Sequence, residues 1–449
     1  MSQAPSLGWV GILRLGIVQM ALGSIVVLAT STMNRIMVVE LALPAMIPAA
    51  LVALHYAIQI LRPRFGFGSD LGGRRTPWIV GGIAALGFGA TLATVAMSLM
   101  PQSRIAGVAL AVVAFAIIGA GVGAAGTSLL VLLAKRVVEK RRPIAATMVW
   151  LMLIVGFVIT SIIVGKVLDP YTPLRLTAIT AIVSTIALLL TLAALYRIES
   201  PQKFVAATSS APPVKPDFMA ALKEVWDEPQ ARRFTLFVFV SMLAYSGQEL
   251  ILEPFAGAAF GMTPGQSTQL SGVQHGGVLL GMILVNIACS LLGGKGLGSL
   301  RTWTIIGCAA SAVALLALTA AGSMAPNWPL KQNVFMLGVA NGAFAVSAIG
   351  SMMTLAGAGR GSREGVRMGL WGAAQAIAFG FGGFLGAAAS DVAKLALGSP
   401  GLAYGIVFAF EATLFVVAAT LARNIGRPAS TTSYASQSDF SSMAQQSNA

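Results

Sequence analysis

The sequence predicts an all-α integral membrane protein of twelve transmembrane helices, built as two six-helix halves related by pseudo-symmetry. Three observations predict this fold class. Of the 449 residues, 56% are hydrophobic and only 10% are charged, whereas an ordinary soluble domain has roughly 25% charged residues. Apolar stretches long enough to cross a bilayer recur along the chain. The basic residues gather in alternate connections between those stretches, and this composition excludes a soluble fold.

Each predicted span contains the roughly 20 mostly apolar residues that a transmembrane helix needs. The spans are expected at residues 12–32, 44–61, 76–99, 105–134, 143–165, 174–196, 233–253, 270–292, 302–322, 332–358, 368–389 and 402–422. The first lacks a small-residue cleavage site before polar sequence, so we interpret it as a helix of the protein and not as a removable signal. The longest polar stretch separates two groups of six spans. The expected units are a first half (1–196), a linker (197–232), a second half (233–423) and a tail (424–449).

The basic residues predict how the chain is oriented, because Lys and Arg are enriched in cytoplasmic loops. Most of the 29 basic residues fall in segments that share one side of the membrane with both termini. Both termini are therefore expected in the cytoplasm. The basic residues left on the outer side are Arg35, Arg104, Lys166, Arg175, Lys331 and Lys394.

Two polar segments at the predicted cytoplasmic side have distinct compositions. In the linker, the apolar residues between Phe218 and Trp226 share one helical face, which predicts a short helix on the membrane surface. An ordinary solvated connector is the alternative. The tail from Ser430 onward is rich in Ser and Gln and is expected to be disordered.

A loop motif lies between the second and third predicted spans, where the sequence reads Gly66-Phe-Gly-Ser-Asp70-Leu-Gly-Gly73-Arg74-Arg75. The aspartate can pair with arginines across the gap between helices, and the glycines permit a tight turn. The string resembles the loop signature of the major facilitator superfamily, in the loop where that superfamily carries it. Residues 293–301 are a degenerate copy without the aspartate. A second similarity between the halves is found in residues 40–44 and 249–254, which read Glu-Leu-Ala-Leu-Pro and Glu-Leu-Ile-Leu-Glu-Pro. Both segments are expected to end a helix, and such internal repeats are known in transporters.

Both histidines of the chain, His55 and His275, lie in apolar stretches at equivalent places of the two halves. An ionisable residue inside the membrane is a functional candidate by default. A neutral imidazole can serve as axial ligand to the magnesium of a tetrapyrrole, or it can relay protons. The simpler alternative is an imidazole that is hydrogen-bonded to a neighbouring helix.

Other polar residues are also predicted inside the membrane. Glu249 and Glu253 lie one helical turn apart, close to the outer surface, and Glu411 lies deeper in the last span. These carboxylates are candidates for carrying protons, although a glutamate followed by Pro254 also fits the end of a helix. Further candidates for lining a cavity or holding helices together are Gln59 and Gln274.

The sequence contains no P-loop, no Rossmann fingerprint, no metal-ligand cluster and no Ser-His-Asp arrangement. It therefore does not predict an enzyme, and any transport would be secondary. Cys289 and Cys308 fall in apolar runs, and two cysteines are too few for a structural zinc site. The net charge of +14 is scattered through short loops, so no nucleic-acid partner is expected.

Four stretches point to a narrower family than the superfamily motif does. They are Asn34-Arg-Ile-Met-Val-Val-Glu-Leu-Ala-Leu-Pro44, Val225-Trp-Asp-Glu-Pro-Gln-Ala-Arg-Arg-Phe-Thr235, Leu250-Ile-Leu-Glu-Pro-Phe-Ala-Gly257 and Leu270-Ser-Gly-Val-Gln-His-Gly-Gly-Val-Leu-Leu-Gly281. They resemble the PucC/LhaA family of photosynthetic bacteria, also called the bacteriochlorophyll delivery family. The resemblance covers the chain from the first span to the last and is most specific around His275.

The resemblance implies a factor that assembles light-harvesting complexes in the intracytoplasmic photosynthetic membrane, part of the bacterial inner membrane. It implies that bacteriochlorophyll is bound or delivered to antenna polypeptides, with reaction-centre or pigment-synthesis proteins as further candidate partners. It supplies no pigment-ligating position, so the ligand role of His55 and His275 is our own hypothesis. One alternative is a proton-coupled secondary transporter of a small hydrophobic solute, with Glu249, Glu253 or Glu411 carrying protons. The other alternative is an antenna chaperone that binds no pigment.

Overall fold

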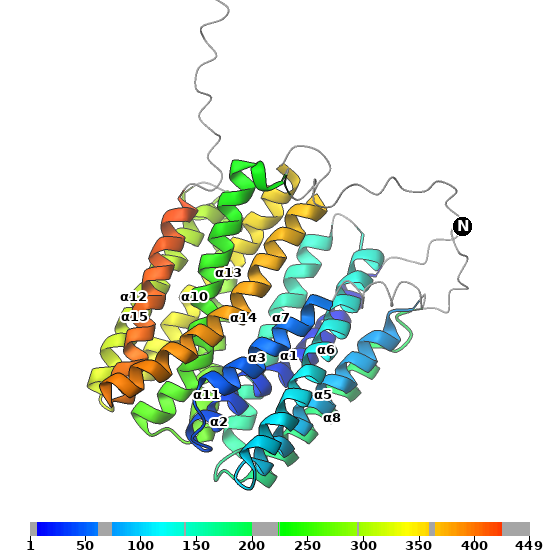
Figure 1. Cartoon of the computed structure of the whole chain (residues 1–449). Coiled ribbons are helices and arrows are strands. Elements are labelled where there is room, and N and C mark those ends of the chain that lie inside the picture. Colours follow the sequence, from blue (N-terminus) through cyan, green and yellow to red (C-terminus); the bar gives the residue numbers. More distant parts are fainter. Residues whose placement is uncertain are drawn as a thin grey trace, which may run out of the picture.

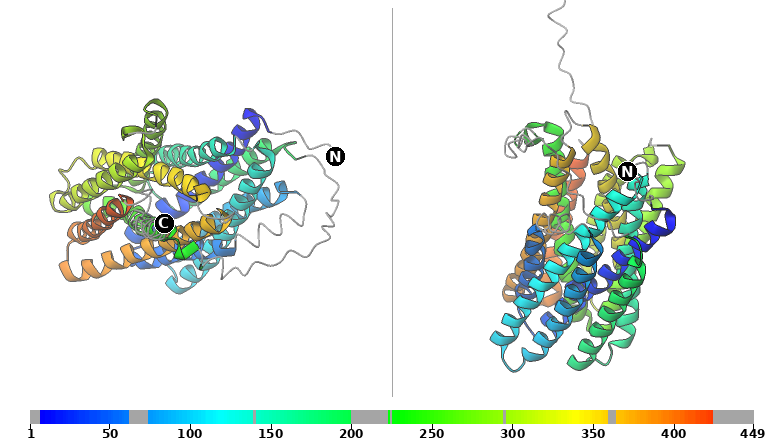
Figure 2. Two further views of the ribbon diagram at one scale, coloured as in Figure 1. Left: turned by 90° about the horizontal axis from the view of Figure 1, so that it is seen from above. Right: turned by 90° about the vertical axis from the view of Figure 1, so that its right-hand side faces the viewer.

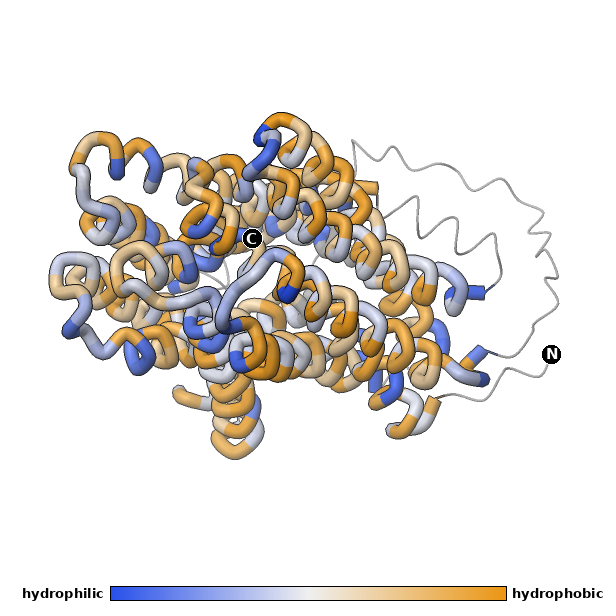
Figure 3. The backbone as a smooth tube through the Cα atoms, turned by 90° about the horizontal axis from the view of Figure 1, so that it is seen from below, coloured by the Kyte–Doolittle hydropathy of each residue, from blue (hydrophilic) through white to orange (hydrophobic). Residues whose placement is uncertain are grey.

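The computed structural model describes residues 7–61, 74–138, 141–199, 223, 225–293, 296–358 and 364–423. The regular secondary structure of these residues is entirely helical, and the helices run side by side in one bundle (Figure 1). Most residues of these helices are hydrophobic, as the colours of Figure 3 show. This is the arrangement that a bilayer demands, because a helix satisfies its backbone polar groups internally.

The first half starts with one long span in three parts: α1 (Trp9–Val27), a π-helical turn (Leu28–Thr32) and α2 (Met33–Val39). A shorter helix follows, α3 (Met46–Ile58), which ends in a 3₁₀ turn (Gln59–Leu61). The remaining helices of this half are α5 (Thr76–Leu99), α6 (Arg104–Arg136), α7 (Arg142–Val167) and α8 (Pro173–Leu195).

The second half contains six long helices. They are α10 (Pro229–Phe260), α11 (Pro264–Leu291), α12 (Leu300–Met324), α13 (Leu330–Ala358), α14 (Glu364–Leu397) and α15 (Pro400–Ala422). A 3₁₀ turn, Gly296–Gly298, precedes α12. Proline occupies the first turn of several of these helices, where its missing N–H has no intrahelical partner to lose.

The predicted fold class is confirmed. Within the described ranges, eleven helices are long and apolar enough to cross a membrane, and the shorter apolar helix Met46–Leu61 occupies the second predicted span. The third span coincides with its prediction at residues 76–99. The surface helix predicted between Phe218 and Trp226 lies largely outside the described residues, as does the tail.

Several expected boundaries were wrong. The eleventh span was expected to stop at residue 389, but α14 continues to Leu397, so Lys394 lies in a helix and not in an outer loop. Two other boundaries have an explanation in tertiary contacts. The first span was expected to stop at residue 32, but it continues to Val39, so Arg35 is a buried helical residue and does not belong to an outer loop. The seventh span was expected to stop at Glu253–Pro254, but α10 runs through this proline to Phe260. In both places, tertiary contacts compensate for residues that normally end an apolar helix.

Most buried apolar side chains form separate cores in the two halves, and a small cluster of Ile154, Val278 and Met282 joins α7 to α11. One cluster consists only of residues between 234 and 422, and a second consists almost entirely of residues between 21 and 187. In Figures 1 and 2 the blue-to-teal helices lie mainly on one side of the bundle and the yellow-to-red helices on the other. On this basis we propose that the two halves are the structural units of the chain.

Candidate functional site at the seam between the halves

The halves meet along a seam made by three sets of helices. α7 packs against α11, α3 packs against α14, and α2 with the preceding π-helical turn packs against α10 and α11. Polar side chains of the described residues concentrate in the third contact. It is the candidate site because small hydroxyls, an amide, two carboxylates and an imidazole face one another there in an otherwise apolar bundle.

The π-helical turn supplies the hydroxyls of the first half. Ser31 Oγ donates a hydrogen bond to Glu253 Oε1 of α10 and lies 3.2 Å from Ser271 Oγ of α11. The neighbouring Thr32 Oγ1 lies 3.2 Å from Thr268 Oγ1. A π turn inserts one extra residue into a helix and is frequent at functional sites. Here it brings two successive hydroxyls to the second half.

Asn34 explains how α10 passes through a proline. Pro254 has no N–H to donate to the carbonyl of Leu250, four residues earlier. The side-chain amide of Asn34 donates to that carbonyl instead, at 2.6 Å from Nδ2 to O. The first half therefore repairs a backbone defect of the second, and this explains why the sequence-based helix end at Glu253 was wrong.

The hydrogen bond from Asn34 predicts that the effects of substituting Asn34 and Pro254 on stability depend on each other. Replacing Asn34 with alanine leaves the buried carbonyl of Leu250 without a donor, so we expect the free energy of unfolding to fall by about 1–3 kcal/mol. In a Pro254→Ala background, the new backbone N–H can serve the same carbonyl, and the Asn34→Ala penalty should shrink. Unfolding of all four proteins in mixed micelles measures this difference. Equal penalties in the two backgrounds would contradict the repair.

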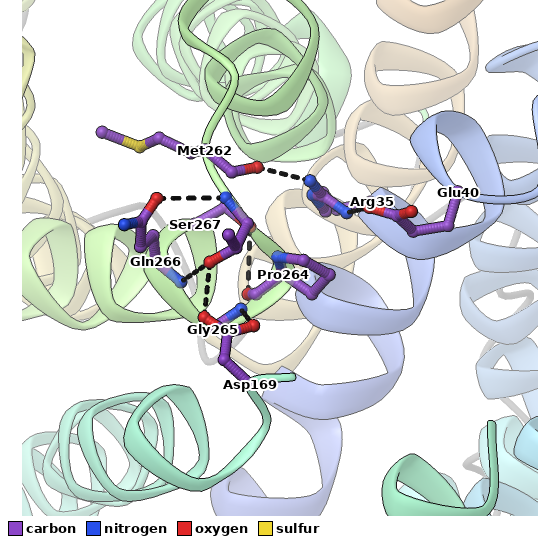
Figure 4. Close-up of polar contacts among 9 residues, drawn as sticks. Arg35, Glu40, Asp169, Met262, Pro264, Gly265, Gln266 and Ser267 are labelled. Carbon is purple, nitrogen blue, oxygen red and sulfur yellow. Dashed lines mark hydrogen bonds and ion pairs between the residues drawn. The ribbon is translucent and has the colours of Figure 1, made fainter. Parts of the chain in front are cut away.

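A second polar cluster lies farther along the seam (Figure 4). Arg35 Nη1 is 2.5 Å from Glu40 Oε1, and Arg35 Nη2 donates to the carbonyl of Met262 at 2.6 Å. Asp169, from the connection between α7 and α8, accepts from Gly265 N at 3.0 Å and from Thr263 Oγ1 at 2.5 Å. An anion at the first turn of α11 also interacts favourably with the helix dipole.

The connection that holds Asp169 also places Tyr171 near Arg35 and Glu40. Burial, followed by the negative charge of Glu40, raises the pKa of Tyr171, while the charge of Arg35 acts in the opposite direction. This tyrosine is therefore neutral at neutral pH. The cluster ties the first half to the first turn of α11.

His275 is a predicted site residue that lies at the seam. Its Nδ1 is 2.8 Å from the carbonyl of Ser271, and its Nε2 is 3.8 Å from Glu249 Oε1. Its ring packs edge-on against Phe157 of α7, with centroids 4.8 Å apart. The structure thus brings His275 and Glu249 together. The adjacent Gln274 is also buried in α11.

His55 occupies a different part of the seam. Its Nε2 lies 2.9 Å from Nε2 of Gln59, one turn later, and its ring packs against Tyr56. Tyr56 in turn contacts Phe379 of α14 across the seam. His55 therefore lies on the α3–α14 side and His275 on the α7–α11 side, and the structure pairs the first with Gln59 and the second with Glu249.

Glu411 stands apart from the other predicted carboxylates. It is buried within the second half, where Oε1 lies against Gly247 of α10 and faces Gly386 of α14. Neither of its carboxylate oxygens has a hydrogen-bond partner among the described residues. Two glycines therefore make room for a side chain that takes no part in the seam.

The two histidines do not fit a pigment in this conformation. His55 and His275 are only 2% and 3% exposed, and aromatic rings cover part of each imidazole. An imidazole that serves as axial ligand needs a free ring nitrogen with open space in front of it for a flat macrocycle. The proposal that these imidazoles hold bacteriochlorophyll stays a prediction, and the geometry favours structural and proton-exchanging roles for them. The described residues contain no group of three or more His, Cys, Asp or Glu side chains that would hold a metal ion.

Most of the loop motif cannot be placed, because Gly66, Asp70 and Gly73 lie outside the described residues. Of its members, Arg74 is exposed and Arg75 is buried. The start of α5 is held by Glu199, whose carboxylate accepts from the backbone N–H groups of Arg75 and Thr76. The sequence did not single out Glu199, since it follows the sixth span by a few residues and resembles any loop carboxylate.

Comparison with known proteins places the chain in a family. The model of the family described as PUCC protein matches residues 32–429. The chain belongs to this family. The resemblance found in residues 34–44, 225–235, 250–257 and 270–281 is thereby confirmed.

Two PUCC relatives extend over nearly the full length. The Rhodobacter capsulatus protein named bacteriochlorophyll synthase 44.5 kDa chain is 52% identical over 420 residues, which cover 94% of this chain and 96% of that protein. Protein PucC of Cereibacter sphaeroides is 29% identical over 417 residues, covering 89% of this chain and 88% of the relative.

Solved structures show the same fold at low identity. A D-xylose-proton symporter superposes with a TM-score of 0.68 at 15% identity, covering 92% of this chain and 97% of its own. A bacterial homologue of the human lysosomal transporter Spinster, inward-facing and unoccupied, gives a TM-score of 0.62 at 14% identity, covering 92% and 95%. This PUCC protein therefore has the fold of major facilitator transporters.

Proposed function

We propose that this protein is an assembly factor for light-harvesting complexes, which binds bacteriochlorophyll or delivers it to antenna polypeptides. The observation that carries the proposal is the 52% identity, over almost the whole of both chains, to a relative whose name refers to bacteriochlorophyll. PucC relatives of similar length support the same role.

The architecture is compatible with this role. The long helices expose apolar side chains to lipid, where antenna helices and a tailed pigment also reside; on α8 they include Leu174, Ile182, Ile186 and Leu189. The polar side chains of the seam, in contrast, bind one another. A pigment would therefore reach the protein from the membrane or through an opened seam, and antenna polypeptides are the proposed partners.

We propose a non-enzymatic role, although one relative is named as a synthase chain. The fold is that of carriers, and the buried carboxylates and imidazoles of the seam contact side chains of the protein itself. On this proposal the relative's name reflects a link with the pigment pathway. The proposed location is the intracytoplasmic photosynthetic membrane, with both termini in the cytoplasm, and reaction-centre or pigment-synthesis proteins are secondary candidate partners.

A deletion strain of the source bacterium tests the proposed function. Without the gene, we expect the antenna absorption bands in the near infrared to fall relative to total extracted bacteriochlorophyll, and the wild-type gene should restore them. Unchanged antenna bands would contradict the proposal and leave the secondary transporter of a small hydrophobic solute as the better account. Complementation with a His55→Ala, His275→Ala double variant asks separately whether the imidazoles are needed.

A further inference from the structure

Glu253 is a buried carboxyl group in the middle of the contact between the halves. Its side chain is 2% exposed, Oε1 accepts from Ser31, and Oε2 has no partner among the described residues. An ionised carboxylate would leave a charged oxygen without a donor in an apolar bundle, which is costly. A carboxylic acid needs fewer partners, so this closed seam suits the protonated form.

A chain of proton-exchanging groups leads from Glu253 to the edge of the buried region. Ser31 Oγ lies 3.2 Å from Ser271 Oγ, which lies 3.4 Å from Nδ1 of His275. The same Nδ1 is 2.8 Å from the carbonyl oxygen of Ser271. The other ring nitrogen of this histidine, Nε2, is 3.8 Å from Glu249 Oε1. The Glu249 side chain is 21% exposed. The chain therefore joins a fully enclosed carboxyl group to a partly accessible one.

The series of proton-exchanging groups includes residues of both halves. The protonation state of Glu253 therefore affects a contact between the halves. Ser31 belongs to the first half, whereas the other four groups belong to α10 and α11 of the second. The charged and titratable groups that face Glu253 are Arg35 and His275. Glu249, at the other end, faces His275 and Tyr245.

We propose that Glu253 is a proton-binding site and that the occupancy of this site controls whether the seam is closed. A proton from water binds the Glu249 carboxylate and passes to Nε2 of His275. The Nδ1 proton, which points to the carbonyl of Ser271 in the closed seam, then turns to Ser271 Oγ. The hydroxyl proton of Ser271 moves to Ser31 Oγ, and that of Ser31 moves to the Glu253 carboxylate. One proton enters and one is bound; each hydroxyl ends as it began, and the imidazole changes from its Nδ1–H to its Nε2–H tautomer.

Loss of the proton would open the seam, because an anion at Glu253 requires donors or water that the closed packing does not supply to Oε2. The neighbouring repair of α10 by Asn34 would then break in the same movement. This inference concerns the two-state behaviour of the bundle and does not depend on the role in antenna assembly.

The test is a distance measurement on the full-length protein in lipid. Spin labels replace Leu174 of the first half and Met324 of the second, both more than half exposed, in a background with Cys289→Ser and Cys308→Ala. We expect the distance between the labels to change with pH in this protein. Glu253→Gln, which cannot ionise, should abolish the change and hold the distance at its low-pH value.

Glu411→Gln is the matched control, because Glu411 is a similarly buried carboxyl group without a hydrogen-bond partner among the described residues, but it does not belong to this series of proton-exchanging groups. It should keep the pH-dependent change. A distance that does not respond to pH, or one that still responds after Glu253→Gln, overturns the proposal. If that variant does not fold, Ser31→Ala replaces it: the proposal requires this variant to move the midpoint pH of the change, and an unmoved midpoint overturns it.

Discussion

Replacing Arg367 with methionine is expected to lower the free energy of unfolding by about 3 kcal/mol, because it removes one partner of a buried ion pair. Arg367 of α14 is 1% exposed. Its Nη2 donates to Glu228 Oε1 at 2.7 Å and its Nε to Oε2 at 3.1 Å, so the pair is bidentate. Because Glu228 is the residue at the N-cap position of α10, the pair fixes the start of that helix against α14.

Arg367→Lys is the control for this prediction. Lysine keeps the charge but has no planar fork, so it can form only one of the two bonds and should lose an intermediate amount of stability. Unfolding in mixed micelles with increasing sodium dodecyl sulfate measures both variants. If Arg367→Met were as stable as the wild type, the cost of burying the two charges would cancel their attraction, and the pair would add nothing to stability.

The second large effect concerns a glycine contact between α11 and α13. A Cβ atom at Gly281 would collide with the carbonyl oxygen of Val339 and lie 2.9 Å from the backbone N of Ala343. Backbone atoms cannot move aside as a flexible side chain can. We therefore expect Gly281→Ala to force the helices apart and to cost about 1–3 kcal/mol of the free energy of unfolding.

The same helix offers a matched control, because a Cβ atom at Gly276 would meet nothing within 4 Å. Gly276→Ala makes the same chemical change and should be neutral, or stabilising by up to about 1 kcal/mol through the higher helix propensity of alanine. The two variants are compared in the same unfolding assay. Equal stabilities would show that helix propensity, and not close packing, governs these glycines.

Much of the fold could be predicted from the sequence, because hydrophobicity over about 20 residues is a local property. The span at 76–99 is an example, since a charged pair precedes it and polar residues follow it. Pro254 shows the limit. The repair of its missing hydrogen bond comes from Asn34, more than two hundred residues earlier in the chain, and no local pattern reveals such a donor.

The candidate site was predictable only in part, for a related reason. Charged and aromatic groups in apolar stretches are conspicuous, so the sequence singled out His275, Glu249 and Glu253. It could not show that Ser31 joins them, because a serine in an apolar helix is common and a π-helical turn has no recognisable pattern. Arg35 was misplaced for the opposite reason: an arginine normally ends a span, but this one has Glu40 and a carbonyl as partners.

The most direct test of the proposed assembly role is the near-infrared absorption spectrum of the protein, purified under mild conditions from its native membrane together with whatever subunits accompany it. The proposal predicts a bacteriochlorophyll band and antenna polypeptides in the same fraction. A band that persists in the His55→Ala, His275→Ala variant would place the pigment outside the two imidazoles. Antenna polypeptides without pigment would indicate a pigment-free chaperone, and a folded protein with neither pigment nor antenna polypeptides would contradict the assembly role.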